Sequence, residues 1–144
     1  MERYRMENEL VSIVMVNYNQ EKFLKKAIDS VLIQTYKNDD GSTDRSVDII
    51  KEYEDDRIKP IFLQENSHIC IATNTGFAAV NGKYIARLDS DDIWEKEKLE
   101  KQMDFLQQNP DAKVCFTQIE LIDENGENIN DREPELLSLY NSRQ

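Results

Sequence analysis

Carboxylates are the residues of this chain whose spacing is most suggestive of chemistry. They gather in two short polar segments, Asp39-Asp40-Gly41-Ser42-Thr43-Asp44 and Asp89-Ser90-Asp91-Asp92. Acidic groups that share one crevice repel one another unless a cation neutralises them, and Mg²⁺ or Mn²⁺ prefers carboxylate oxygens. Magnesium sites commonly use one or two carboxylates and complete the shell with water and phosphate. We therefore expect a divalent metal that helps to hold a nucleotide diphosphate.

Each acidic segment also has a purely structural interpretation. The first would serve well as a loop that leads into a helix N-cap. The second has three acids within four residues, which is more than a cap needs. Taken singly, neither segment decides between a metal site and a turn.

The segments around these acids alternate between strand and helix patterns. Strands are predicted at 11–16, 58–63 and 84–88, with a further extended strand at 114–122, and helices over 23–31, from 42–44 to 53, over 69–80 and over 95–108. This alternation predicts a three-layer α/β sandwich around a mostly parallel sheet. Ligands of such sheets bind beyond the carboxyl ends of the strands, where Asn17-Tyr18-Asn19 forms another polar loop.

Composition narrows the class of protein. The 144 residues suit a single domain, and 29 acidic against 18 basic residues give a net charge of −11, the wrong sign for binding nucleic acid or anionic membrane. We find no apolar run long enough to span a bilayer and no signal peptide, so we expect a cytoplasmic protein. Cys70 and Cys115 are predicted to be buried thiols, without a disulfide or a zinc site.

Several motifs, in their order along the chain, resemble glycosyltransferase family 2, whose members have the Rossmann-like A-type (GT-A) fold that binds nucleotide-diphospho-sugars. The resemblance runs from about Leu10 to Gly126. Its motifs in this chain are Val-Ser-Ile-Val-Met-Val-Asn-Tyr-Asn at 11–19, Ser-Val-Leu-Ile-Gln-Thr-Tyr at 30–36, the acidic segment at 39–44, Asn-Thr-Gly at 74–76, Gly-Lys-Tyr-Ile at 82–85 and Leu-Asp-Ser-Asp-Asp at 88–92.

The resemblance implies a nucleoside-binding role for four of these residues. Tyr18 and Asn19 would line the pocket for the base. Asp39 or Asp40 would accept hydrogen bonds from the base or the ribose. We expect a uridine-based donor.

The resemblance also implies that Asp89-Ser90-Asp91 is the family's DxD motif. Asp91 would be the principal ligand of Mn²⁺ or Mg²⁺, and Asp89 would lie toward the ribose and contribute to the metal site. The metal would bridge the diphosphate oxygens, and an inverting transfer would deliver the sugar to a glycan or lipid-linked acceptor. Such an acceptor would place the protein at the inner face of a membrane. A homo-oligomer is compatible with this interpretation.

The chain departs from the family pattern in three places. The short apolar strand that normally precedes the Asp-Asp-Gly loop has no room between Tyr36 and Asp39. His68 stands where the family usually has glycine and Thr73 where it usually has arginine, although Asn66, Ala72, Asn74 and Gly76 match.

The third departure lies at the far end of the resemblance. We expect 1–126 to be a nucleotide-sugar-binding domain that is incomplete on its acceptor side, followed by a polar tail over 127–144. Glu120, Asp123 and Glu124 are better explained as turn or strand-edge residues, so no catalytic base is assigned.

Two neighbours of the second acidic segment have structural interpretations as well. Trp94 is expected to anchor the following helix, with shielding of the site as the alternative. Arg87 is expected to form an ion pair with a nearby acid, with a phosphate contact as the alternative.

Two other functions compete with metal-dependent sugar transfer as explanations of the sequence. The first is a catalytically incomplete module that binds a donor or a partner without transfer. The second is a phosphotransfer receiver domain, which would need its acid pair after the first strand, where this chain has Asn17-Tyr18-Asn19.

Overall fold

The protein is described by a computed structural model that covers residues 9–18, 20–34, 39–43, 49, 52–61, 63 and 68–141. The chain forms two compact units, Met1–Glu100 and Lys101–Gln144. The division of the chain at residue 126, expected from sequence, stays a prediction.

The first unit is built on a three-stranded parallel sheet in the order β2-β1-β3. The central strand β1 (Val11–Val16) is flanked by β2 (Asp39–Thr43) and by β3 (Tyr84–Asp89). β1 is apolar at most positions and buried on both faces, as expected for the middle of a parallel sheet.

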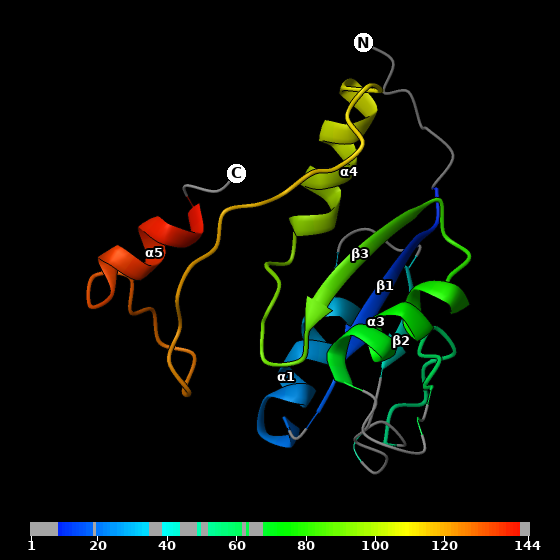
Figure 1. The fold of residues 1–144 in the computed structure, drawn as a ribbon, viewed down its shortest axis with the longest axis horizontal. Coiled ribbons are helices and arrows are strands. Elements are labelled where there is room, and N and C mark those ends of the chain that lie inside the picture. Colours follow the sequence, from blue (N-terminus) through cyan, green and yellow to red (C-terminus); the bar gives the residue numbers. More distant parts are fainter. Residues whose placement is uncertain are drawn as a thin grey trace. The chain divides into compact units, whose positions relative to one another are not determined.

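Helices lie on both faces of this sheet. In Figure 1, α3 (His68–Ala79) crosses the front of the sheet and α1 (Glu21–Leu32) lies behind it. α1 buries a stripe at helical spacing that includes Leu24, Ala27, Ile28 and Val31. The α/β architecture with a parallel sheet between helices is therefore confirmed.

The acidic segment at 39–43 is a strand, and the prediction that it is a loop was wrong. Asp, Gly and Ser are poor strand formers, so the sequence pattern gave no strand signal here. β1 nevertheless has a hydrogen-bonding edge to satisfy, and Asp39–Thr43 pairs with Val11–Met15 along it. This segment thus occupies the place of the apolar strand that the family pattern has in front of it.

Two further predicted strands do not form within the described residues. The structure has irregular chain at 58–61 and at 63, with an isolated bridge at Ile58, because Pro60 lacks the N–H that a ladder needs. Residues 112–121 form no strand among the described residues, and Phe116 is 74% exposed. The helix expected to run from 42–44 to 53 falls largely outside the described residues.

The second unit contains most of α4 (Lys98–Gln108) and a helix that the sequence left undefined, α5 (Pro134–Asn141). α4 begins three residues later than the predicted 95, a common uncertainty at helix ends. A turn at 123–127 is closed by the bridge between Ile122 and Asn128, and Gly126 adopts a φ of 89° there.

α3 is less buried than its small residues suggested. Of the helix, Gly76 is buried, whereas Ile69 is 57% and Ile71 is 55% exposed. Cys70 is exposed and Cys115 half-buried, so the prediction of two buried thiols was wrong, although both cysteines are free. In the case of Cys70, the reason is that α3 presents most of its surface to solvent.

Gly82 fixes the approach of β3 to β1. Its N–H donates to Ser12 Oγ over 2.9 Å, and a Cβ at this position would lie 2.6 Å from the Ser12 backbone nitrogen. Only glycine permits so close a contact, so the start of β3 is set against the start of β1.

No helix within the described part of the chain has the length and hydropathy to cross a membrane.

Candidate functional site

The sheet register brings two polar loops together at one edge. Val16 pairs with Asp89, so the chain leaves β1 and β3 side by side at their carboxyl ends. Asn17 follows β1 and is 1% exposed, whereas the next residue, Tyr18, is 51% exposed. This edge is where a parallel sheet usually binds its ligand.

The acidic turn, defined here as Asp89–Asp92, closes directly after β3. The Asp92 N–H donates to the Asp89 carbonyl oxygen over 3.0 Å, and Ser90 is buried at 3% exposure. Asp91 and Asp92 face solvent, and Asp89 is half-buried. The turn therefore has a buried centre and carboxylates at its surface.

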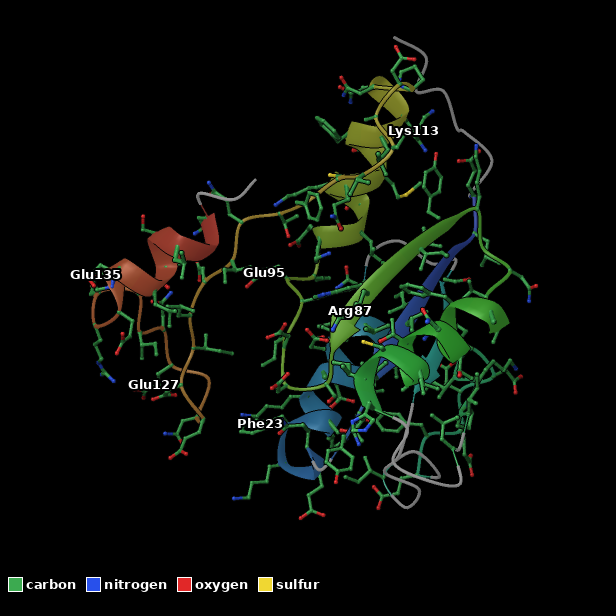
Figure 2. The ribbon with its side chains drawn as sticks, viewed as in Figure 1. Phe23, Arg87, Glu95, Lys113, Glu127 and Glu135 are labelled. Carbon is green, nitrogen blue, oxygen red and sulfur yellow. The ribbon has the colours of Figure 1, made fainter. Side chains whose placement is uncertain are left out.

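Each of the two DxD carboxylates has a different partner. Arg87 Nη2 lies 2.6 Å from Asp89 Oδ1, and the structural ion pair expected for Arg87 is confirmed. Gln20 Nε2 donates to Asp91 Oδ2 over 3.3 Å. Figure 2 labels Arg87 on β3. Asp89 is thus neutralised by a cation, and Asp91 is held by a neutral amide that leaves its charge in place.

Electrostatics in the turn favour a bound cation. The pKa of Asp92 is raised, first because neighbouring groups shield part of its carboxyl from solvent although the residue as a whole is exposed, and then because Asp91 and Asp89 carry like charges. Arg87 opposes this shift and does not cancel it. A raised carboxylate pKa means that negative charge is disfavoured here, so a bound cation would reduce the repulsion among the carboxylates of the turn.

The donor set fits a substrate-completed metal site better than a closed cage. Within the described residues, no three His, Cys, Asp or Glu side chains are grouped so as to hold a metal ion. Of the two DxD carboxylates, Asp91 is exposed and Asp89 is half-buried. Two such carboxylates together with phosphate oxygens are what Mg²⁺ commonly uses, so Asp91 and Asp89 fit the metal role.

The structure does not bring Asp39 and Asp40, the β2 acid pair, to this edge. Asp39 pairs with Val11 and Asp40 with Ser12, at the start of β1, whereas Asp89 pairs with Val16 at its end. At about 3.3 Å per residue, the two positions are roughly 16 Å apart along the sheet. Of the remaining predicted residues, Tyr18 lies at the edge, and Asn19 lies outside the described residues.

The other sequence departures are placed as follows. His68 is the exposed first residue of α3, and its φ of 62° lies in the left-handed region that favours the glycine of the family pattern. Thr73 is half-buried within the same helix. Trp94 is 7% exposed, which supports its anchoring role.

Two carboxylates of the second unit, Asp123 and Glu120, accept hydrogen bonds in and beside the turn at 123–127. Asp123 Oδ1 accepts the N–H groups of Asn125 and Glu127 at 2.9 and 3.0 Å, and these bonds, that of Glu127 first, lower the pKa of Asp123. Glu120 Oε2 accepts from Asn128 Nδ2 over 3.1 Å. These contacts agree with the turn interpretation of Glu120 and Asp123.

Sequence reasoning missed Gln20. It lies just before α1 and reaches the acidic turn across 71 positions of the chain. A glutamine before a helix carries no functional pattern of its own. Its position at the carboxyl edge, immediately after Asn17-Tyr18-Asn19, is the one signal that could have marked it.

Comparison with known proteins identifies the family and the fold. The model for glycosyl transferase family 2 matches residues 12–144. The chain is 38% identical over 125 residues to the putative teichuronic acid biosynthesis glycosyltransferase TuaG of Bacillus subtilis, covering 81% of this chain and 49% of TuaG. It is 37% identical over 126 residues to the glucosyltransferase WfgD of Escherichia coli, covering 83% of this chain and 49% of WfgD.

Two solved structures share the fold. Staphylococcus aureus TarS 1–349 in complex with UDP-GlcNAc aligns with a TM-score of 0.67 and 17% identity over 78% of this chain and 40% of that one. The mannosyltransferase PcManGT of Pyrobaculum calidifontis, in complex with GDP-Man and Mn²⁺, aligns with a TM-score of 0.62 and 16% identity over 68% of this chain and 32% of that one. These likenesses confirm the GT-A fold.

The chain spans about half the length of TuaG and WfgD. Their similarity nevertheless covers more than four-fifths of this chain. The chain belongs to glycosyltransferase family 2.

Proposed function

We propose that this chain binds a uridine-based nucleotide-diphospho-sugar at the carboxyl ends of β1 and β3, with a divalent metal, for inverting transfer to a glycan or lipid-linked acceptor. The observation that carries the proposal is the register of Val16 with Asp89, which sets the acidic turn beside the loop after β1. Support comes from TarS, solved with UDP-GlcNAc, and from WfgD, whose name specifies UDP-Glc as donor. A lipid-linked acceptor would bring the protein to the inner face of a membrane.

The roles of the residues follow from their exposure and partners. Asp91 presents its carboxylate to solvent while Gln20 holds one oxygen, so it is the main candidate for the metal. Asp89 would share the metal and face the ribose, with Arg87 limiting the negative charge of the pair. When bound, Mn²⁺ or Mg²⁺ would offset the diphosphate charge and stabilise the leaving nucleoside diphosphate. PcManGT, solved with GDP-Man and Mn²⁺, supports this choice of metal.

Tyr18 completes the donor side of the proposal. Its ring is 51% exposed next to the acidic turn's edge of the sheet, so it is available to contact a base. The base or ribose contacts expected of Asn19, Asp39 and Asp40 stay predictions. The register separates Asp39 and Asp40 from this edge, so we expect them to contribute little to affinity in this chain.

Calorimetric titration with uridine diphosphate, with and without Mn²⁺, tests the proposal. Asp91→Ala should weaken Mn²⁺-dependent binding about 10- to 100-fold, because an oxygen ligand is lost while no buried residue is touched. Asp111→Ala, at an exposed acid in the second unit, is the matched control and should leave binding unchanged. The double variant Asp39→Ala/Asp40→Ala should also bind with nearly wild-type affinity.

Each outcome has a definite meaning. Wild-type binding that ignores Mn²⁺, or that survives Asp91→Ala, contradicts the metal role of the acidic turn. Metal-dependent binding without sugar transfer to any glycan or lipid-linked acceptor would favour the alternative, a module that holds the donor and transfers nothing.

A further inference from the structure

Two buried polar side chains at the end of α1 have no place in the site as described so far. Ser30 is 3% and Gln34 6% exposed, and both belong to the motif at 30–36. A buried polar side chain is costly unless its hydrogen bonds are made, so their partners show what the two residues do.

Gln34 binds the chain on both sides of the start of α4. Its Nε2 donates to the carbonyl oxygen of Ser30 over 2.9 Å and to that of Glu95 over 3.0 Å. Its Oε1 accepts from the N–H of Leu99 over 3.2 Å. Leu99 is in the first turn of α4, where N–H groups lack partners inside the helix, so Gln34 caps α4 from a position two residues beyond the end of α1.

Ser30 binds the same segment nearer to the acidic turn. Its Oγ donates to the Ala27 carbonyl oxygen over 2.7 Å and accepts from the Trp94 N–H over 3.1 Å. Trp94 follows Asp92 by two residues and is itself buried at 7% exposure. Figure 2 labels Glu95 on the segment that leaves this turn.

Ser30 in α1 and Gln34 just after it therefore hold three backbone groups of the segment that follows the acidic turn. They are the Trp94 N–H, the Glu95 carbonyl and the Leu99 N–H. The other end of the turn is held by β3, whose Leu88 is 2% exposed. The acidic turn is thus fixed on one side by the sheet and on the other by Ser30 of α1 and by Gln34.

We propose that Ser30 and Gln34 are positioning residues for the acidic turn, which they hold in the geometry that binds a divalent cation with a nucleoside diphosphate. The inference rests on the proposed function for the identity of this ligand. Mutation of residues that hold the ligands of a metal commonly lowers the metal affinity by about 10-fold or more, because these residues fix the positions of the ligand oxygens. A residue that only packs the core would change stability and leave the turn's geometry as it was.

The test uses the full chain and two readouts. The first is the affinity for Mn²⁺ with uridine diphosphate, measured by titration. The second is independent of metal: amide hydrogen exchange across Asp89–Leu99, together with the fluorescence of Trp94, the single tryptophan of the chain. Gln34→Ala should weaken Mn²⁺–nucleotide binding about 10-fold and speed exchange within the acidic turn. Gln108→Ala, at an exposed position of the same helix that Gln34 caps, is the matched control and should change neither readout.

Two further variants keep the test decisive if Gln34→Ala folds poorly. Ser30→Ala removes the acceptor of the Trp94 N–H and the bond to the Ala27 carbonyl oxygen, while the contacts of Gln34 stay, and should give a smaller loss of affinity with a shift of Trp94 emission. Gln34→Glu places a carboxylate against the Ser30 and Glu95 carbonyl oxygens, and its protonation restores a donor. Its deficit relative to wild type, measured at each pH, should therefore narrow as the pH falls.

Wild-type exchange rates at Asp89–Asp92 and wild-type affinity in folded Gln34→Ala and Ser30→Ala would overturn the inference. A wild-type chain that binds no Mn²⁺–nucleotide contradicts the proposed function instead. In that case the exchange and fluorescence measurements still decide whether Ser30 and Gln34 position the turn.

Discussion

Two acid-rich segments of this chain look alike in sequence and differ completely in position. The acidic turn follows an apolar strand, so its carboxylates emerge at the carboxyl end of the sheet, beside the end of β1. In the sequence, no apolar run stands between Tyr36 and the β2 acid pair, and the segment Asp39–Thr43 itself pairs with β1 from Val11 onward. The same residue types therefore lie at the carboxyl edge of the sheet in one place and along a strand in the other. An acidic motif depends for its chemistry on the strand that delivers it.

The largest expected effect comes from damaging the strand that delivers the acidic turn. Leu88 is 2% exposed and immediately precedes Asp89, so Leu88→Ala should lower the free energy of unfolding by about 2–5 kcal/mol. Ile85→Ala on the same strand is the control, because Ile85 is 50% exposed and should cost less than about 1 kcal/mol. Chemical denaturation measures both. Equal effects of the two substitutions would mean that β3 does not anchor the turn through Leu88.

A second experiment supplies the strand that the β2 acid pair lacks. Insertion of a β-branched segment of about five residues before Asp39 should take over the pairing with β1. Asp39 and Asp40 would then emerge at the carboxyl edge beside Asn17. We expect affinity for uridine diphosphate to rise about 10-fold, the scale of one hydrogen bond to a charged group.

The control for this insertion is a Gly-Ser segment of the same length, which should not pair as a strand. If both insertions leave affinity unchanged, delivery by a strand does not limit what Asp39 and Asp40 can bind.

The smallest expected effect is a pH dependence within the acidic turn. The folded pKa of Asp92 is raised, so ionisation of Asp92 costs stability above that pKa and costs nothing below the unfolded value of about 3.8. Asp92→Asn should stabilise the protein at pH 7 by less than about 1 kcal/mol, because solvent screens an exposed group, and the gain should vanish near pH 3.

Asp55 provides the opposite sign for comparison. The Arg57 guanidinium and N–H lower the pKa of Asp55 to about 2. This pair stabilises the fold above the unfolded pKa and is lost as the pH falls toward 2, so Asp55→Asn should destabilise the protein at neutral pH. Denaturation curves from pH 2 to 7 follow both variants, and a matching sign for the two would contradict these assignments.

Periodicity predicts much of the first unit correctly. The apolar run of β1, the buried stripe of α1 and the alternation before Asp89 each have one dominant explanation in the sequence. β2 could not be predicted, because its residues disfavour strands and only the exposed edge of β1 explains their pairing. The segments at 58–63 and 114–122 have strand-like composition, but composition cannot supply a neighbouring strand to pair with.

The candidate site also has residues that the sequence predicts and contacts that it does not. Asp89 and Asp91 were correctly placed at a strand's carboxyl end because an apolar strand immediately precedes them. The contact of Gln20 with Asp91, and those of Ser30 and Gln34 with Trp94–Leu99, join residues that are more than sixty positions apart. No local pattern reports such hydrogen bonds, since they depend on how α1 meets the chain after β3.

The close approach of Gly82 to Ser12 also has a consequence for how the chain folds. This contact joins residues 70 positions apart, and the parallel pairing of β1 with β3 begins at the same place. The entropy of closing this long loop is lost before the hydrogen bonds between β1 and β3 can compensate for it, so we expect the sheet to assemble slowly. During synthesis, the apolar run of β1 leaves the ribosome long before β3 exists to cover its edge. In that interval the nascent chain is most exposed to aggregation, and chaperones would have most to protect.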